Sequence, residues 1–489
     1  MNTAIIGGGI GGMITALYLN LKGEEVSIYE KENRLGGRLS YTGQDGFKVD
    51  EGPTIVLLPH MIREILKEVQ FDMSKIDMVR IDPIYPLHFR DGTTFMKWSD
   101  PDKQKQEIDN HFPGESVHYA AYMKDMAHRF EKGKEAFLDR AFVSKRSFWS
   151  RKNVNTLMKL KAYQTVKNQT RKYFQAKQLQ EAFSLQTLYI GGSPEQTPAI
   201  YSLVPFSEHE HGIWYIKGGY AYLAQLLTEE LANRGVHIKY GAEVEDIQVE
   251  KNRATSLTVH SKQIYYDRFI LNGDFPVAEK LVNKKTSRSY TPSAGCLLIY
   301  LGIEGQLNTK HVHQFFMGRN LDKQMEEIFT QKKLPEDPSF YLFHPSIIDD
   351  TLAPVGKSVA YILIPVPTSS DITREEFEAY ANKMIKELKA RLDPDIEDKI
   401  LWKQIRTPKE AKRDGLFEGG SFGLAPTLFQ SGVFRPQVKP FAYDNIYAVG
   451  ASIHPGGGVP IVMQGAKVLS EYLDEEEQFL NRAKTNSSQ

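Results

Sequence analysis

The chain has 489 residues, with 61 basic and 61 acidic side chains and therefore no formal net charge. This balance argues against nucleic acid as a general partner, because nucleic-acid binding draws on an excess of cations. The single cysteine, Cys296, permits no internal disulfide, as expected for a reducing compartment, and its apolar surroundings in the sequence predict a core position. A chain of this length is long enough for about two or three domains.

Neither a transmembrane helix nor a targeting peptide is predicted. The longest apolar run, 294–303, is far shorter than the ~20 residues that a membrane-spanning helix needs. A strand expected from residue 3 leaves no room for a signal peptide before it. We therefore expect a cytoplasmic protein.

The first thirty residues predict a strand–turn–helix–strand unit that holds a dinucleotide. Its glycine turn and the acidic residue after the second strand are Gly7-x-Gly9-x-x-Gly12 and Glu30. Gly7 permits the tight turn, Gly9 lets the backbone approach a pyrophosphate, and Gly12 lets the helix pack closely on the strand. Glu30 is placed to accept hydrogen bonds from a ribose diol, which disfavours the 2′-phosphate of NADP.

A second glycine motif indicates which dinucleotide is bound. It follows Glu30 as Arg34-Leu35-Gly36-Gly37-Arg38. Its glycines let the chain pass close to a further stretch of cofactor, and its arginines can reach phosphate oxygens. An NAD dehydrogenase does not need this element, whereas an enzyme with an extended flavin does. The sequence therefore predicts FAD.

Near the other end of the chain, a side-chain-poor loop predicts a surface for the flavin ring. A buried strand ends at Gly450, and the loop Pro455-Gly456-Gly457-Gly458-Val459-Pro460 leads to a helix expected from about Ile461. Such a loop can lie flat against an isoalloxazine. The helix N-terminus behind it can stabilise negative charge on the reduced flavin.

Taken together, these motifs resemble those of the flavin-containing amine oxidase and phytoene desaturase superfamily. The segment 447–460 is similar to the C-terminal signature of bacterial carotenoid desaturases. Further segments resemble the branch that acts on thirty-carbon substrates, the 4,4′-diapophytoene desaturases: Gln186–Gly191, Tyr201–Leu203, Ile216–Gly219, Phe422–Thr427 and Arg435-Pro436. The resemblance spans nearly the whole chain.

The resemblance implies several cofactor contacts. The backbone of Val244 is expected against the adenine end of FAD. The C-terminal segment is expected against the flavin, through Gly450, Ala451, Gly458, Val459 and Pro460.

An FAD-dependent desaturase is the activity that the resemblance implies. It would remove hydrogens stepwise from colourless 4,4′-diapophytoene to give conjugated products such as diaponeurosporene, and pass electrons to oxygen or a membrane quinone. The first alternative is a related oxidase of the terminal methyl of diaponeurosporene or diapolycopene, followed by a C40 phytoene desaturase and then an amine oxidase. A prenyl-chain carrier without flavin is disfavoured, because every motif glycine and Glu30 are present.

Desaturation needs few catalytic side chains, and the sequence offers few. After hydride loss, a cation delocalised along the polyene must lose a neighbouring proton. The candidate bases are His454, in the flavin-facing loop, and Asp50 and Glu51, in a glycine–proline turn; a water and the reduced flavin are alternatives. No metal site is predicted, because His209 and His211 lack a third ligand and are expected in a surface loop.

One segment departs from the overall neutrality. Between Asp139 and Glu181 there are eleven basic residues, interleaved with aromatic ones, and no acidic residue. Each Lys or Arg near an anionic membrane contributes about 1 kcal/mol to binding. Residues 140–180 therefore predict peripheral attachment to a membrane that supplies the hydrophobic polyene; a solvated helical cap is the alternative.

The order of elements predicts an α/β fold of interleaved domains, and Thr373-x-x-Glu376 predicts a capped helix over 375–391. We expect a Rossmann-type FAD-binding domain, a mixed-sheet substrate domain, a helical basic cap that faces the membrane, and a flexible tail. Their expected ranges are 1–72, 217–280 and 440–475; 73–100 and 281–439; 101–216; and 476–489.

Overall fold

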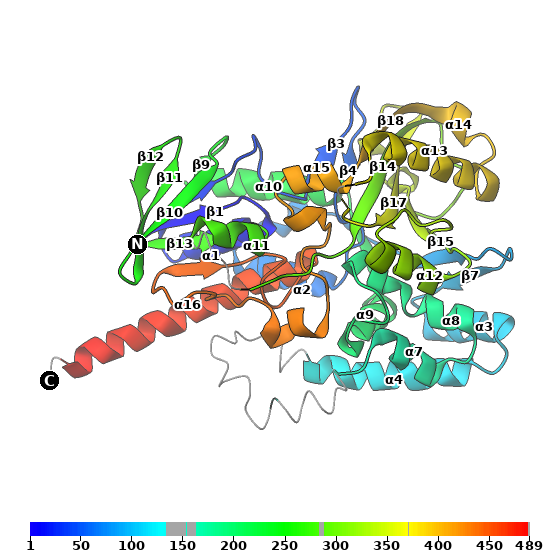
Figure 1. Cartoon of the computed structure of the whole chain (residues 1–489), viewed down its shortest axis with the longest axis horizontal. Helices are drawn as coiled ribbons and strands as arrows, with labels where there is room; N and C mark the ends of the chain where they lie inside the picture. Colours follow the sequence, from blue (N-terminus) through cyan, green and yellow to red (C-terminus); the bar gives the residue numbers. More distant parts are fainter. Residues whose placement is uncertain (134–152, 154–162, 283–287, 370, 488–489) are drawn as a thin grey trace.

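The computed structural model describes residues 1–133, 153, 163–282, 288–369 and 371–487. Figure 1 shows a parallel sheet with its helices beside a larger mixed sheet, with a group of helices below the mixed sheet. The expected α/β class, with more than one sheet, is therefore observed.

The parallel sheet has five strands, in the order β19-β13-β1-β2-β9. They are β1 (Asn2–Ile6), β2 (Glu25–Tyr29), β9 (His237–Lys239), β13 (Arg268–Leu271) and β19 (Ile446–Ala448). All four neighbouring pairs are parallel. Strands from three distant parts of the chain thus form one sheet, as the interleaved prediction requires. An antiparallel sheet is attached, formed by β10 (Val244–Glu250), β11 (Arg253–Val259) and β12 (Lys262–Tyr265).

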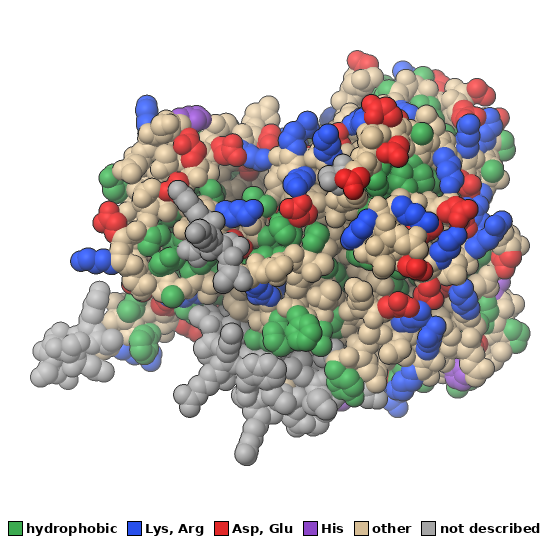
Figure 2. All heavy atoms as spheres, viewed as in Figure 1, with side chains coloured by type: hydrophobic (Ala, Val, Ile, Leu, Met, Phe, Trp, Pro, Cys, Tyr) green, Lys and Arg blue, Asp and Glu red, His purple; other side chains and the backbone are tan. Residues whose placement is uncertain are grey.

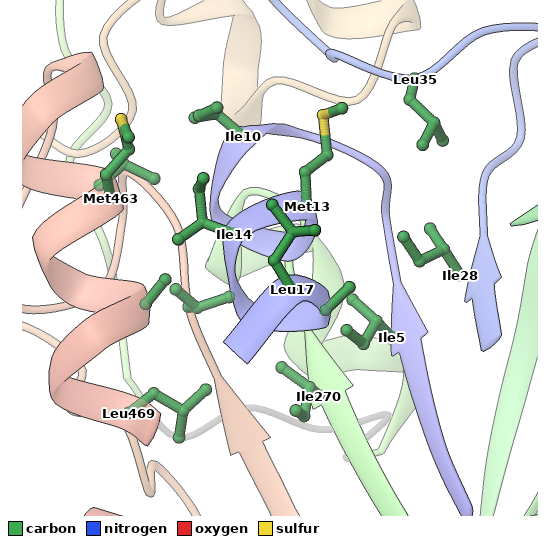
Figure 3. Packing of buried hydrophobic residues seen from close by; sticks show 14 of the residues in the cluster. Ile5, Ile10, Met13, Ile14, Leu17, Ile28, Leu35, Ile270, Met463 and Leu469 are labelled. Atoms are coloured by element: carbon green, nitrogen blue, oxygen red, sulfur yellow. The ribbon is translucent and has the colours of Figure 1, made fainter. Parts of the chain in front are cut away.

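Helix α1 (Ile10–Leu21) joins the two ends of the chain. Figure 3 shows Ile14 and Leu17 of α1 between the parallel sheet and the side of α16 (Val459–Ser487) that carries Met463 and Leu469. All four side chains are fully buried, and burial of each such side chain stabilises the fold by about 1.5–3 kcal/mol. This packing fixes the C-terminal loop next to the N-terminal glycine turn.

The second sheet has seven strands, in the order β18-β14-β17-β16-β15-β6-β7. They are β6 (Tyr85–His88), β7 (Thr94–Lys97), β14 (Gly295–Glu304), β15 (His313–Phe316), β16 (Phe340–Phe343), β17 (Lys357–Val366) and β18 (Ile400–Arg406). Side chains alternate between its two faces. On β14, Leu297 and Ile299 pack toward α13 (Arg374–Arg391), whereas Cys296 and Leu298 belong to the cluster on the opposite face.

The remaining elements connect and cover these sheets. The helices are α2 (Pro59–Glu68), α3 (Pro101–His111), α4 (Ser116–Gly133), α7 (Val166–Tyr173), α8 (Lys177–Ala182), α9 (Leu203–His211), α10 (Gly219–Asn233), α11 (Phe275–Ala278), α12 (Leu321–Glu326), α14 (Ile396–Lys399) and α15 (Pro408–Arg413). Two short strand pairs are β3 (Tyr41–Thr42) with β4 (Val49–Asp50), and β5 (Met78–Ile81) with β8 (Ile213–Ile216).

The ends of helices α13 and α16 can be compared with the sequence predictions. The capping box of α13 is confirmed, since Thr373 Oγ1 accepts a hydrogen bond from the Glu376 N–H and the Glu376 carboxylate accepts one from the Thr373 N–H. Helix α16 begins at Val459, two residues before the expected Ile461, and continues through Ser487 where a flexible tail was expected. Glu477 anchors this extension through a 2.7 Å ion pair with Arg268.

The histidine pair also differs from expectation. His209 and His211 end helix α9 rather than lying in a surface loop. His209 is buried, and its Nδ1 lies 2.8 Å from the backbone oxygen of Trp98. Within the described ranges, no group of three potential ligands is placed to hold a metal ion.

Most of the basic segment 140–180 lies outside the described residues, so its expected role at a membrane is untested. In the described part, Lys167 pairs with Glu195 at 2.5 Å and with Asp322 at 2.8 Å. This cation is therefore engaged within the protein. Of the helices that the structure describes, none combines the length and apolar character needed to cross a bilayer.

Candidate functional site

A single cavity of about 1340 Å³ extends from the carboxyl ends of β1 and β2 to the mixed sheet. Ligand sites commonly lie at this edge of parallel sheets. The volume exceeds the ~300–1,000 Å³ of an ordinary small-molecule pocket. The cavity therefore has room for more than one drug-sized ligand.

Most of the predicted cofactor residues line this cavity. They are Gly7, Gly9, Glu30, Arg34, Gly36, Gly37, Arg38, Val244, Gly450, Ala451, Gly458, Val459 and Pro460. The remaining one, Gly12, lies behind the turn, where a Cβ would come within 2.5 Å of the Gly7 oxygen. Gly12 thus permits the close packing of helix on strand that the motif predicts.

The two glycine motifs contact each other directly. The Gly36 N–H donates to the Gly8 oxygen at 2.9 Å, and a Cβ at Gly37 would lie 3.3 Å from the Gly9 Cα. Gly7 has a φ of +101°, which side chains rarely adopt. Side chains at these positions would fill the space between the turns, so the residues present form a backbone-lined cradle that fits a dinucleotide.

Glu30 is held beside this cradle at the end of β2. One carboxylate oxygen accepts the Gly8 N–H at 2.8 Å, and the other accepts the Glu32 N–H at 3.0 Å. The side chain is only 7% exposed and lines the cavity. These bonds fix the orientation of the carboxylate, as a contact to a ribose diol requires.

The second motif places its charges on the same cavity. Arg34 lies 3.4 Å from the carboxylate of Glu51, which also accepts a 2.6 Å hydrogen bond from Ser40 Oγ. Arg38 donates to the Ser421 oxygen at 3.0 Å, and burial lowers the pKa of its guanidinium. Glu51 thus borders the cavity.

Asp50, one of the candidate bases, does not line the cavity. It caps helix α10 by accepting the Ala221 N–H at 2.9 Å, and burial raises the pKa of its carboxyl to about 7. A Cβ at Gly219 would lie 1.8 Å from the Asp50 carboxylate, so only glycine permits this contact. Asp50 thus holds the start of helix α10 in place.

The C-terminal loop forms the part of the wall that was predicted for the flavin ring. His454 lies in this loop, lines the cavity and is 3% exposed. Its backbone N–H donates to the Pro436 oxygen at 2.8 Å. Helix α16 starts directly from the loop, so its N-terminus is close to the cavity.

The other half of the cavity is walled by one face of the mixed sheet, which sequence analysis did not assign residue by residue. Its wall includes Cys296 and Leu298 of β14, Phe315 of β15, Tyr341 of β16, and Tyr361 and Leu363 of β17. Alternating positions on β14 and β17 share this face, and that period-two pattern is the signal from which they could have been found. Burial raises the pKa of the Cys296 thiol to about 12, so it remains protonated.

Hydroxyl groups in this wall bond into the protein. The hydroxyl of Tyr341 lies 2.8 Å from Thr54 Oγ1 and 2.6 Å from His313 Nδ1. The hydroxyl of Tyr189 donates to Glu208, which forms a fully buried 3.1 Å ion pair with Lys97. Tyr341 and Tyr189 therefore present mainly their rings to the cavity.

Large apolar side chains are exposed where the cavity reaches the surface. Leu428 and Phe429 line the cavity, and Phe429 is 71% exposed. They belong to the short helices 428–430 and 432–434, drawn in orange in Figure 1, at the position of a hydrophobic patch in Figure 2. Exposed apolar surface of this kind marks a site of contact with a partner, a ligand or a membrane.

Comparison with known proteins yields one family and several relatives. A family model described as flavin containing amine oxidoreductase matches residues 10–467. A 4,4′-diapolycopen-4-al dehydrogenase of Metabacillus indicus is 50% identical over 483 residues, covering 97% of this chain and 98% of that protein. A 4,4′-diapophytoene desaturase (4,4′-diaponeurosporene-forming) of Staphylococcus haemolyticus is 33% identical over 504 residues, covering 97% and 99%.

Solved structures share the fold. An oxidoreductase of Methanosarcina mazei aligns with a TM-score of 0.65 at 15% identity, covering 96% of this chain and 100% of that one. A putrescine oxidase bound to putrescine aligns with a TM-score of 0.66 at 11% identity, covering 98% and 99%. Identities this low show a common architecture and carry no information about substrate.

The geometry of Glu30 generates a prediction about cofactor affinity. Glu30→Gln removes a charged acceptor, and since a hydrogen bond to a charged group contributes roughly 1.5–3 kcal/mol, FAD should bind about ten- to a hundredfold more weakly. Titration of the apoprotein with FAD, followed by flavin fluorescence, measures this. Glu25→Gln, exposed at the opposite end of β2, is the matched control. Equal dissociation constants for the two variants would contradict the assignment of Glu30.

Proposed function

Because this chain belongs to the family of flavin-containing amine oxidoreductases, we propose that it desaturates a linear thirty-carbon carotenoid precursor. The substrate is 4,4′-diapophytoene, and stepwise removal of hydrogens gives conjugated products such as diaponeurosporene. The observation that carries the proposal is the continuity of the cavity, in which a dinucleotide cradle opens into a chamber walled by apolar and aromatic side chains. The desaturase relative at 33% identity supports the same substrate class.

The protein is an FAD-dependent oxidoreductase, and FAD supplies a two-electron oxidant when it is bound. Gly7 and Gly9 form the backbone cradle for the dinucleotide, Glu30 is oriented toward its ribose, and the loop 455–460 lies where the ring is expected. These residues would hold the cofactor in the part of the cavity next to the parallel sheet.

The chain's own residues act on the substrate chiefly by positioning it and excluding water. Rings of Phe315, Tyr341 and Tyr361 line the chamber, and such a wall can hold a polyene in extended form by dispersion and burial of apolar surface. Among the proposed bases, Glu51 and His454 line the cavity and Asp50 does not. Proton removal therefore falls to Glu51, His454, a water or the reduced flavin.

A second candidate reaction is oxidation of an aldehyde end group on the same carbon skeleton. It is favoured by the relative at 50% identity, whose name states that it is a 4,4′-diapolycopen-4-al dehydrogenase. The two reactions share the cofactor and the apolar chamber. They differ in whether the end or the interior of the chain lies against the flavin.

Product analysis separates the two reactions. The FAD-loaded protein is incubated with liposomes that carry 4,4′-diapophytoene or, separately, 4,4′-diapolycopen-4-al, and lipid extracts are analysed by visible spectroscopy and mass spectrometry. We expect the colourless substrate to yield a yellow, three-peaked polyene spectrum, with loss of two hydrogens per step. Conversion of the aldehyde alone, with no product from 4,4′-diapophytoene, would reject desaturation in favour of the second reaction.

We further propose that the protein works on the cytoplasmic surface of a membrane, from which the polyene enters, and passes electrons to oxygen or a quinone. The exposed Leu428 and Phe429 at the cavity opening support this proposal, since amphipathic surfaces of this kind insert at the headgroup boundary. The eleven Lys and Arg side chains of the segment 140–180 also support the proposal, because cations are attracted to an anionic membrane surface.

Vesicle binding tests the membrane proposal. The full-length protein should cosediment with vesicles of mixed phosphatidylglycerol and phosphatidylcholine, and binding should fall as salt is raised. Phe429→Ser should reduce the bound fraction several-fold, because it removes apolar surface from the contact. Val355→Ser, at a fully exposed position away from the cavity, is the control and should bind like the wild type. Failure of the wild-type protein to sediment with anionic vesicles would refute the proposal.

A further inference from the structure

Arg435 is a buried cation at the cavity wall. It is 4% exposed and lines the cavity. One terminal nitrogen donates to the Ala451 oxygen, and the other lies 3.5 Å from the Gln430 oxygen. Within the described ranges its Nε has no hydrogen-bond partner, and no carboxylate lies within ion-pair distance. Among the described residues, the hydrogen bonds of this guanidinium go to the neutral backbone oxygens of Ala451 and Gln430.

The charge lies directly against the loop predicted to face the flavin. The guanidinium carbon of Arg435 is 3.9 Å from the position that a Cβ on Gly456 would take. Ala451, which accepts its hydrogen bond, is one of the residues expected to contact the cofactor. The N-terminus of α16 follows the same loop at Val459, and its dipole adds a partial positive charge.

Neighbouring charges do not neutralise this region. Arg38 lines the same cavity and donates to a backbone oxygen. Asp274 is the carboxylate that interacts electrostatically with both arginines, and it is hydrogen-bonded by Ser452 Oγ and the Phe417 N–H. Arg38 and Arg435 thus share Asp274, whereas Arg406, which also acts electrostatically on Arg38, pairs with Asp414 at 2.7 Å.

Burial of a cation without a carboxylate in direct contact is costly, and an anion bound beside it would offset that cost. Burial lowers the pKa of both guanidinium groups. Arginine nevertheless remains charged, since its intrinsic pKa is very high. The charge on Arg435 is therefore permanent over the working pH range.

We propose that Arg435 holds the negative charge of reduced FAD and so keeps the two-electron reduced flavin in its ionised form. Uptake of two electrons and one proton by oxidised flavin gives this anion, whereas uptake of two electrons and two protons gives the neutral form. With the ring against the loop 455–460, the fixed cation of Arg435 beside that loop would favour the first outcome. The inference rests on FAD as the cofactor and not on the substrate, so it stands or falls separately from the proposed desaturation.

The pH dependence of the flavin potential tests the proposal without any substrate. For a two-electron couple, a tenfold change in proton concentration shifts the potential by 29.6 mV per proton taken up. Below the pKa of free reduced flavin, where free FAD takes up two protons, the FAD-loaded wild-type protein should therefore show a slope of about 30 mV per pH unit. Arg435→Gln should steepen the slope to about twice that value and lower the potential, and Arg435→Lys should restore both. Arg253→Gln, which removes an exposed arginine bound to the Asp267 backbone oxygen outside the cavity lining, should leave the slope unchanged.

Two outcomes would overturn the proposal. A wild-type slope that corresponds to two protons for every two electrons would overturn it, whatever the variants show. This result remains decisive even if Arg435→Gln does not retain FAD. An unchanged slope in Arg435→Gln, together with a larger dissociation constant for FAD, would mean that the arginine neutralises the pyrophosphate instead.

Discussion

The site depends on one constraint, which is the close approach of backbone segments around the Gly7–Gly12 turn. Asn272, directly after β13, donates its side-chain amide to the Gly7 oxygen at 2.8 Å and to the Gly9 oxygen at 3.2 Å. A Cβ at Gly12 would meet both this amide and the Gly7 oxygen below 3.0 Å. Gly8 in the same turn accepts the Gly36 N–H and donates to Glu30, so side chains here would displace strands as well as the cofactor.

The same turn links the cofactor half of the cavity to the substrate half. Helix α1 starts at the turn and packs on α16, which brings the loop 455–460 to the cavity (Figure 3). The mixed sheet then closes the far side with the face that carries Cys296 and Tyr361, while its other face is covered by α13. An apolar chamber beside a redox cofactor suits a substrate without polar groups, because positioning replaces recognition by hydrogen bonds.

Features set by local chemistry could be predicted from the sequence. Gly7, Gly9, Gly36, Gly37, Glu30 and the loop 455–460 all line one cavity, since a need for close backbone approach is visible in the residues themselves. Features set by long-range packing could not. Asp50 turns away from the cavity to cap α10, and His209 is buried against Trp98. In both cases the partner lies far away in the sequence.

The same limit explains why the substrate half was located only as a domain. The residues on its wall come from strands β14–β17, and their pairing decides which alternate positions face the cavity. Arg435 was noted only as part of a resemblance, because nothing in its neighbours along the chain shows that its charge is buried without a carboxylate.

The central claim is that one cavity brings FAD and a thirty-carbon polyene into contact. Anaerobic single turnover tests it most directly, with the visible absorbance of the bound flavin recorded after mixing with 4,4′-diapophytoene in vesicles. The account predicts that the oxidised-flavin band bleaches in step with the appearance of the first conjugated product. An oxidised-flavin band that persists while the protein is saturated with FAD and 4,4′-diapophytoene would contradict this contact.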